Sequence, residues 1–372
     1  MAATDERATR LRWASAALAL TLVAGPGAAA DRVGGAVSYY ADDNAVRVVS
    51  PRVSATVERG RATLDARAAV DFVSAASVDL VTAASPRGFE ETRVETGAAA
   101  KWRASPLQTV GADASISIEP DFHTWRVGAL AAREMFSRHG TLELGYGFSR
   151  SEIGRRDDAA FSRGRTTYDL LLGYSHVLGP RTALDVGSTL TLVDGFQANP
   201  YRWVRLYAPG GTLHATAVPE QAPETRWRSG TSLRLRTRLV PHLFGLAEYR
   251  LYADTWGVVA HTARLRATLG LGSEAWTLWL EARGSTQGAA SFYRARYATF
   301  PSAPDLRTAD KDLGPMWTAL AGLHLEWSPP VTRLSALRFG VGGDLYRMRY
   351  LDYAFLTART AVIGVFDVTT EF

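Results

Sequence analysis

The sequence predicts an all-β chain that forms a transmembrane, antiparallel, up-and-down β-barrel of about sixteen strands. Three observations indicate this fold. Segments of about ten to fifteen residues alternate between apolar and polar side chains, as tilted membrane strands do. The connections between them alternate between short and long, and the chain ends in an aromatic residue. We expect short turns on the periplasmic side and long loops on the extracellular side.

The stretch RWRSGTSLRLRTRL at residues 226–239 shows the alternation most clearly. Its five arginines all occupy even positions, and tryptophan or leucine occupies four of the odd positions between them. Successive side chains of a strand leave opposite faces, so the segment has a charged face and an apolar face. A soluble β-sandwich would leave the five arginines repelling one another on one surface. A barrel wall instead places them in an aqueous lumen and the leucines in lipid.

The same two-residue period recurs along the chain after residue 30. It is present at 62–72, 110–119, 142–148, 263–271, 276–284 and 317–327. No 3.6-residue period competes with it in these segments, so helices are not expected there. Tryptophan and tyrosine near the segment ends fit the aromatic girdles of a membrane barrel. These residues are Trp102, Trp125, Trp227, Trp256, Trp276, Trp317, Trp327 and Tyr350.

Turn-forming residues divide the connections into two classes. Short turns rich in glycine, proline and serine are expected at 58–61, 105–108, 137–140, 178–181, 240–242, 272–275 and 328–333. Long connections are expected at 77–91, 153–165, 196–225 and 291–315. An even number of strands places both termini on the same side, as single-chain bacterial barrels require.

Residues 1–30 indicate a cleavable export signal, which leaves 31–372 as one barrel domain. Three arginines precede a twelve-residue apolar stretch at 13–24, and small residues end at Ala30. A stretch of that length is too short to be a permanent membrane anchor. The predicted location is therefore the outer membrane of a bacterial cell. The chain has no cysteine, which excludes thiolate metal sites and cysteine nucleophiles.

The charge composition argues against nucleic acid as a partner. The chain has 42 basic and 37 acidic residues, and only Lys101 and Lys311 are lysines. The arginines are spread over strands, with no block of basic residues and no basic patch with interleaved aromatics. Arginine, alanine and glycine are abundant together, which a biased genomic base composition would also produce.

Inward positions divide into a predicted basic wall and a predicted acidic wall. The basic wall consists of Arg226, Arg228, Arg234, Arg236, Arg238, Arg250, Arg264 and Arg266, with Glu248 among them. The acidic wall consists of Asp65, Asp71, Glu95, Asp113, Glu119, Glu143, Asp169 and Asp185, partly offset by Arg67, Arg93, Lys101, Arg103 and Arg126. Such a transverse field favours polar over apolar solutes. Alternatively, the charges pair as structural salt bridges under inward-folded loops.

Catalytic and metal-binding patterns are absent from the sequence, so neither an enzyme nor a cofactor is expected. The seven histidines have no paired zinc spacing. His324 and Glu326 share the predicted lumenal face, where a wall contact is expected rather than acid–base chemistry. Two acidic loop clusters, at 42–44 and 305–312, offer oxygen ligands for calcium but lack the spacing of a helix-loop-helix calcium site. Solvated turn residues are the simpler interpretation.

The chain ends in FDVTTEF, with Phe366, Val368, Thr370 and Phe372 on one face. This pattern is similar to the C-terminal assembly signal that the barrel-insertion machinery recognises. We therefore expect that machinery and the outer-membrane lipid as partners.

Several segments together resemble a family known as domain of unknown function 3570, exported barrel-like proteins of bacteria. They are SYYADDNAVRVVSP, DFVSAASVDLVTAAS, NPYR followed by PETRWR, YRLYADTWGVVAHT and GAASFYRARY. The resemblance implies a β-barrel, and it implies no activity and no catalytic residues.

The expected function is passage of small polar or anionic solutes through a porin-like barrel. Two alternatives stay open. One is a barrel plugged by its own loops that serves surface binding or envelope structure. The other is a barrel hydrolase, which the missing catalytic triad disfavours. The sequence specifies neither the solute nor the oligomeric state.

Overall fold

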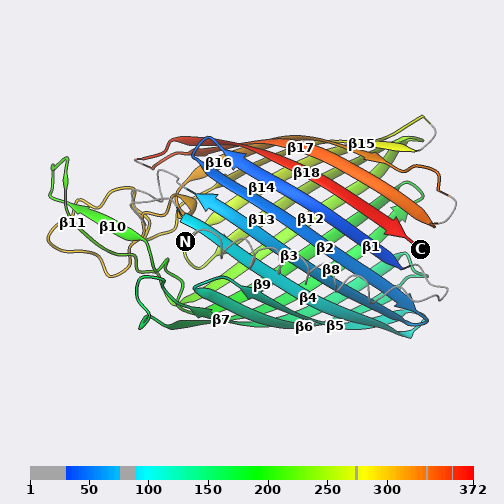
Figure 1. Ribbon diagram of the computed structural model, residues 1–372, viewed down its shortest axis with the longest axis horizontal. Coiled ribbons are helices and arrows are strands. Elements are labelled where there is room, and N and C mark those ends of the chain that lie inside the picture. The colour runs from blue at the N-terminus through cyan, green and yellow to red at the C-terminus, as the bar shows by residue number, and fades with distance from the viewer. Residues whose placement is uncertain (1–30, 76–88, 273–274, 332–333, 354) are drawn as a thin grey trace, which may run out of the picture.

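In the computed structural model, residues 31–75, 89–272, 275–331, 334–353 and 355–372 are described, and the expected export signal lies outside them. Within this part of the chain, sixteen antiparallel strands close into one barrel (Figure 1). The predicted transmembrane up-and-down barrel of about sixteen strands is confirmed. Each strand pairs with its neighbours in chain order, except that β9 pairs with β12 and β1 closes the barrel on β18.

The first half of the barrel comprises nine strands in chain order among the described residues. They are β1 (Arg32–Asp42), β2 (Val46–Arg59), β3 (Ala62–Ala75), β4 (Phe89–Ser105), β5 (Gln108–Ile118), β6 (Phe122–Met135), β7 (Gly140–Ile153), β8 (Arg163–Gly179) and β9 (Thr182–Gly195). Two short strands, β10 (Trp203–Tyr207) and β11 (His214–Pro219), then form a separate sheet within the loop between β9 and β12.

The barrel is completed by β12 (Thr225–Val240), β13 (Leu243–Asp254), β14 (Val259–Leu271), β15 (Trp276–Gln287), β16 (Met316–Trp327), β17 (Ala336–Tyr350) and β18 (Ala358–Glu371). A single turn of 3-10 helix, η2 (Lys311–Leu313), lies in the loop between β15 and β16. No helix in the described ranges has the length and hydropathy needed to cross a membrane.

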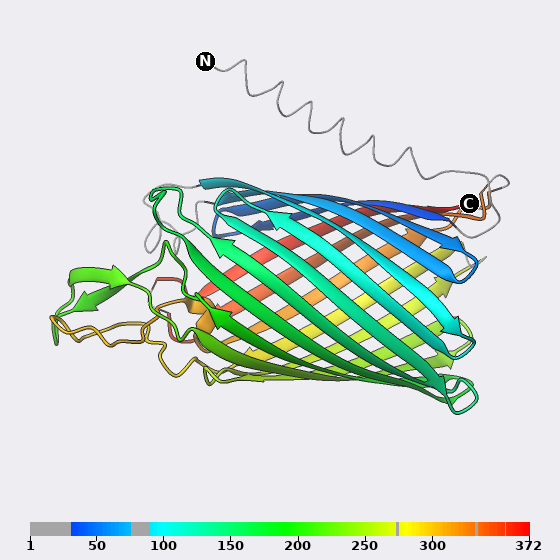
Figure 2. The same cartoon turned by 90° about the horizontal axis from the view of Figure 1, so that it is seen from below.

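Short turns gather at one end of the barrel and long loops at the other, as the sequence predicts (Figure 2). We call these the short-turn end and the long-loop end. The C-terminus lies at the short-turn end, where the Phe372 backbone N donates to Asp31 O at 2.9 Å. The β10–β11 sheet projects beyond the long-loop end (Figures 1 and 2). The expected long connection at 77–91 lies mostly outside the described residues.

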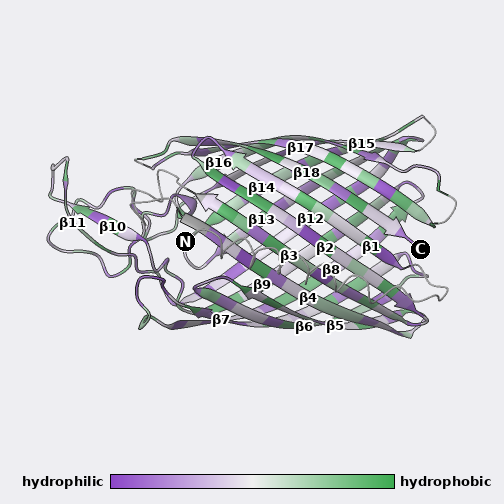
Figure 3. Ribbon diagram, viewed as in Figure 1, coloured by the Kyte–Doolittle hydropathy of each residue, from purple (hydrophilic) through white to green (hydrophobic). Residues whose placement is uncertain are grey.

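The strands form because their two-residue period satisfies two environments at once. Along β5, every second residue is exposed on the outward face, including Val110, Ile116 and Ile118. Asp113 and Ser115 occupy intervening positions and line the lumen. Figure 3 shows the result as alternating hydrophobic and hydrophilic bands along the strands.

Exposed tryptophans mark both ends of the outward face. Trp102, Trp276 and Trp327 lie next to short turns, whereas Trp125 and Trp227 lie near the long-loop end. The rings of Trp276 and Trp327 stack with centroids 5.7 Å apart across β15 and β16. Two girdles separated along the barrel axis are typical of a membrane barrel, because indole prefers the headgroup region.

The girdle prediction is wrong for Trp256 and Tyr350, which are 4% and 3% exposed. Trp256 packs against Phe292 in the long loop after β15, with ring centroids 5.1 Å apart. Tyr350 packs with Tyr353 in a second buried cluster. Trp256 lies in the turn between β13 and β14, and Tyr350 is the last residue of β17, so both are at the mouth, where loop residues cover them. A position near a strand end does not distinguish such a buried site from a lipid-facing girdle.

Candidate functional site

The arginine row of β12 lies on the lumenal face of the barrel wall. Its members are Arg226, Arg228, Arg234, Arg236 and Arg238. They alternate with Trp227, Leu233, Leu235 and Leu239, which are exposed on the outward face. The surroundings of each arginine are therefore set by the register of β12 with β9 on one side and β13 on the other.

Carboxylates on the two neighbouring strands neutralise the middle of the row. Arg234 Nε donates to Glu248 Oε2 of β13 at 2.8 Å, and Arg236 Nη2 donates to Asp185 Oδ1 of β9 at 2.8 Å. Asp185 belongs to the predicted acidic wall. The structure places it beside the arginine row, because the chain returns from the long loop so that β12 pairs directly with β9.

Arg226 has a different counter-ion at the mouth. Its Nε donates to Asp254 Oδ2 at 3.0 Å, and its guanidinium carbon lies 3.9 Å from the centroid of the Trp256 ring. The Asp254 carboxylate also accepts from the backbone N of Trp256 at 2.9 Å and from the Tyr252 hydroxyl at 2.7 Å. Asp254 therefore fixes the turn between β13 and β14 and holds Arg226 at the rim.

The arginines of β14 share a carboxylate that the sequence analysis left out of the basic wall. Arg264 Nη2 and Arg266 Nη2 donate to Glu281 Oε2 of β15 at 2.8 and 2.7 Å. Arg264 also lies 3.8 Å from Glu248. Glu281 occupies an inward position of the alternating segment at 276–284, which follows β14 in the sequence. Because consecutive strands of a barrel are neighbours, the sequence could have predicted this pairing.

Arg228 and Arg250 differ from these paired arginines. Neither has a carboxylate within 4.0 Å among the described residues, and both side chains are exposed to the lumen. Arg228 Nε donates instead to the Tyr252 hydroxyl at 3.3 Å. Arg238, at the short-turn end of β12, also lacks a carboxylate within that distance in the described ranges. Uncompensated positive charge is thus found near the mouth, at Arg228 and Arg250, and at the short-turn end of the row, at Arg238.

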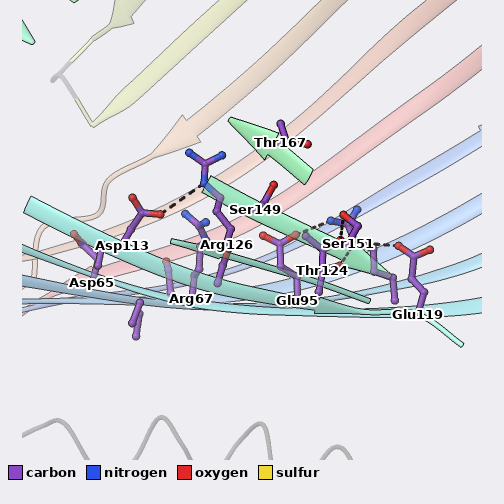
Figure 4. Close-up of a pocket in the computed structure, with 18 of the residues that line it drawn as sticks. Asp65, Arg67, Glu95, Asp113, Glu119, Thr124, Arg126, Ser149, Ser151 and Thr167 are labelled. Atoms are coloured by element: carbon purple, nitrogen blue, oxygen red, sulfur yellow. Dashed lines mark hydrogen bonds and ion pairs between the residues drawn. The ribbon is translucent and has the colours of Figure 1, made fainter. Parts of the chain in front are cut away.

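The opposite wall contains a lumenal cavity of about 940 Å³ lined by residues of β2 to β8 (Figure 4). Four predicted acidic-wall residues line it, namely Asp65, Glu95, Asp113 and Glu119. Five cationic residues line it as well, namely Arg67, Arg93, Lys101, Arg126 and Arg165. The structure therefore brings these four of the eight predicted acidic residues together, but within a mixed-charge surface.

Charges within this cavity are arranged in short pairs. Arg93 Nη2 donates to Glu95 Oε2 at 2.9 Å, and Arg93 Nε lies 3.6 Å from Glu119 Oε1. Arg126 Nη1 donates to Asp169 of β8 at 3.1 Å. Hydroxyl groups fill the intervals between the charges, from Ser54, Thr56, Ser115, Ser117, Thr124, Ser149, Ser151 and Thr167. The surface can therefore form hydrogen bonds with a polar solute at closely spaced positions.

The remaining acidic-wall residues lie elsewhere on the lumenal face. Asp71 lines a second cavity of about 540 Å³ beside Arg52 and Asp367, near the β1–β18 closure. Glu143 of β7 lies opposite Gly173 of β8, where the missing side chain leaves room for it.

His324 pairs with a residue other than the one the sequence suggested. Its Nε2 lies 3.0 Å from Asp344 Oδ1 on β17, and its ring stacks on Trp279 with centroids 5.8 Å apart. A Cβ at Gly342 would clash with the His324 ring, so glycine is needed there. The geometry makes His324 part of a packed wall contact.

The two acidic loop clusters form hydrogen bonds and ion pairs with protein groups. Asp42 accepts from the backbone N of Asn44 and of Val46, at 2.9 and 3.0 Å, and lies 3.4 Å from Arg359. Asp312 forms an ion pair with Lys311 at 3.0 Å. In the part of the chain that the structure describes, no group of three or more histidine or acidic residues is arranged to hold a metal ion.

The C-terminal strand closes the barrel. Phe366 and Val368 of β18 lie opposite Val37 and Gly35 of β1, and the side chains of Phe366 and Phe372 are exposed on the outward face.

The long loops form a separately packed body at the mouth, which we call the cap and define as residues 196–224 and 288–315. Val204 and Leu206 of β10 are 0% and 1% exposed and pack with Tyr297 from the other loop. Backbone hydrogen bonds join the loops, with Tyr207 N donating to Tyr297 O at 2.8 Å and Arg307 N donating to Gln221 O at 2.9 Å.

A buried ionic cluster also links the two cap segments. Arg202 forms an ion pair with Asp310 and lies 3.6 Å from Glu220. The Glu220 carboxylate accepts from the backbone N of Asn199 at 2.6 Å and from the Thr308 hydroxyl. Burial raises the pKa of the Glu220 carboxyl above its ordinary value of 4.5, although Arg202 opposes this shift.

Comparison with known families adds to this geometry. The family model for proteins of unknown function DUF3570 matches residues 154–353, which is more than half of the chain. The chain belongs to the DUF3570 family. The region matched in this DUF3570 protein contains the whole basic wall and both segments of the cap. No match to a curated protein was found.

Solved structures similar to this DUF3570 protein are outer-membrane barrels. A bacterial polysaccharide outer membrane secretin is 11% identical, with a TM-score of 0.51 over 92% of this chain and 98% of that one. CdiB from Acinetobacter baumannii is 8% identical, with a TM-score of 0.52 over 92% of this chain and 60% of that one. At these sequence identities, the structural similarity establishes only the fold. A function for this DUF3570 protein has to be inferred from its lumenal side chains.

Proposed function

We propose that this protein resides in the outer membrane and allows small polar solutes to cross it, with a preference for anions. The observation that carries the proposal is the lumenal cavity of about 940 Å³, whose wall presents nine charged side chains and a series of hydroxyl groups. Polar groups facing an aqueous lumen offer a solute replacement hydrogen bonds along its path. The protein acts as a passage, and we assign it no enzymatic activity.

The preference for anions is supported by the distribution of unpaired charge. Ion pairs such as Arg234 with Glu248 produce little net field at a distance. Arg228 and Arg250 have no such partner among the described residues, so their positive charge attracts anions near the mouth.

The outward face supports the membrane location and the partners. Two girdles of exposed tryptophan border an apolar band of leucine, valine and isoleucine. Phe366 of β18 and the terminal Phe372 are exposed. We therefore propose lipid contact around the barrel and recognition of β18 by the insertion machinery during assembly.

A second candidate function is favoured by the cap. Residues 196–224 and 288–315 have their own buried core and ionic cluster, and such a rigid body can either close the mouth or bind a partner at the cell surface. This candidate is a plugged barrel with a surface-binding role.

Swelling of liposomes in isotonic solute separates the two candidates. Gly195 N donates to Glu224 O at 2.9 Å, so a short glycine–serine turn can replace residues 198–221 without moving β9 or β12. We expect liposomes containing the native protein to swell in a pentose and to swell less in a trisaccharide. Swelling by the shortened protein alone would support the plugged barrel. Swelling by neither protein, each shown to be folded, would contradict passage.

A further inference from the structure

The guanidinium group of Arg250 lies beside Gly230 on the lumenal face near the mouth, two residues along β12 from Arg228. Gly230 follows Arg228 by two residues on β12, so both positions face the lumen. Arg250 leans across from β13, and a Cβ at Gly230 would lie 3.4 Å from Arg250 Nη2. The absent side chain therefore lets Arg250 approach β12 beside Arg228.

Neighbouring groups orient these arginines without neutralising them directly. The Tyr252 hydroxyl accepts from Arg228 Nε at 3.3 Å and donates to Asp254 at 2.7 Å. Asp254 itself is already paired with Arg226. Both Arg228 and Arg250 keep exposed side chains, and neither has a carboxylate within 4.0 Å in the described part of the chain. Their remaining N–H groups are available to a solute.

A third cation approaches from the other side of β9. Arg165 of β8 lines the large lumenal cavity and stacks on Phe122, with its guanidinium carbon 5.2 Å from the ring centroid. Arg165 of β8 and Arg228 of β12 lie on the two strands that flank β9, opposite Gly195 and Thr191. Arg165 too has no carboxylate within 4.0 Å among the described residues. Three like charges without counter-ions repel one another, and a bound anion would relieve that repulsion.

We propose that Arg165, Arg228 and Arg250 form a binding subsite for a phosphate group on a solute that enters from the mouth. Guanidinium N–H groups match the spacing of phosphate oxygens and are more weakly hydrated than an ammonium group. A doubly charged tetrahedral anion can contact groups on two walls at once, which a chloride ion does less well. The subsite deepens the proposed function, because it names the solute class for which passage through the mouth is selective.

Isothermal titration of the refolded protein in detergent at low ionic strength tests the subsite without requiring conduction. The probes are inorganic phosphate and glycerol 3-phosphate, with chloride as the background anion. We expect Arg228→Gln and Arg250→Gln each to weaken binding about tenfold, and the double variant to weaken it further. The matched control is Arg238→Gln, which removes the same charge at the short-turn end of the same strand and should leave binding unchanged.

The outcomes are distinct for the subsite and for the proposed function. Tighter binding of glycerol 3-phosphate than of inorganic phosphate identifies a phosphorylated organic solute, and equal binding identifies the free ion. No binding by the native protein, or equal losses in Arg228→Gln and Arg238→Gln, overturns the subsite even if the barrel conducts. Phosphate binding by a folded barrel that admits no solute supports the subsite and overturns passage. If the double variant fails to assemble, the single variants Arg228→Gln and Arg250→Gln still test the subsite.

Discussion

Arg234 of β12 and Glu248 of β13 lie directly opposite each other in the strand register, and Arg234 Nε donates to Glu248 Oε2 at 2.8 Å. Together with the ion pairs of Arg226 and Arg236, this pair shows that the arginine row is not a uniform positive stripe. Register alone does not decide which arginines find a partner, because Arg228 is opposite Asp254, yet Asp254 pairs with Arg226. The positive charge that remains to act on solutes is therefore concentrated at arginines without a carboxylate within 4.0 Å among the described residues, which on β12 are Arg228 and Arg238.

Two adjacent substitutions on β12 test the assignment of its faces. Leu235→Arg should block assembly, because an arginine facing lipid near the midplane costs about 2–4 kcal/mol. Arg236→Leu should still assemble, because the Arg236 side chain is 54% exposed and its ion pair with Asp185 contributes about 1 kcal/mol or less. Heat-modifiable mobility on gels measures the folded fraction of each variant. Equal folding of both variants would show that the two faces are assigned the wrong way or that neither faces lipid.

A pair of neighbouring glycines on β17 tests the packing of the lumenal wall. A Cβ at Gly342 would clash with His324, whereas the atom nearest to a Cβ at Gly343 is Ile363 O at 4.0 Å. We expect Gly342→Ala to lower the urea midpoint of unfolding, because His324 must leave Asp344. Gly343→Ala is the matched control and should unfold like the native protein. A midpoint unchanged by Gly342→Ala would mean that His324 moves freely in the lumen.

The buried carboxyl of Glu220 predicts a pH dependence of the cap. Its folded-state pKa is raised above 4.5 by burial, so the closed cap takes up a proton more readily than the opened loops. The resulting stabilisation is fully present below pH 4.5 and is lost as pH rises through the folded-state pKa. Proteolysis within 196–224 should therefore be slower at pH 5 than at pH 8. Glu220→Gln should remove this difference, and a native cap that loosens on acidification would contradict it.

Export should remove residues 1–30, as the order of charged, apolar and small residues in this segment predicts. Mass spectrometry of the protein extracted from membranes should find Asp31 or a close neighbour as the first residue. A membrane-resident protein that retains Met1 would contradict the export route.

Periodicity made the barrel predictable, because the membrane and the lumen impose opposite demands on successive residues. The alternation at 226–239 assigned faces to every arginine of β12, and the structure has the same alternation. The counter-ions were harder to predict. Asp185 reaches the row through a strand pairing across a connection of about thirty residues, which the local pattern does not specify. Asp254 lies on the hairpin partner β13 opposite Arg228, but it pairs with Arg226.

The cap could not be predicted for a related reason. Val204, Leu206 and Tyr297 belong to two loops that are far apart in the sequence, and they form one buried cluster. Their mutual burial follows from the closed order of the strands, which places both loops at one mouth.

Single-channel recording of the native protein in planar bilayers tests the central claim most directly. Refolding is first verified by heat-modifiable mobility, and current is then recorded in a potassium chloride gradient. We predict discrete conductance steps and a reversal potential that indicates anion preference, weaker at 1 M than at 0.1 M salt, where the Debye length is about 10 Å. A folded barrel that gives no steps at any voltage, or whose reversal potential indicates cation preference, contradicts an open lumen governed by its unpaired arginines.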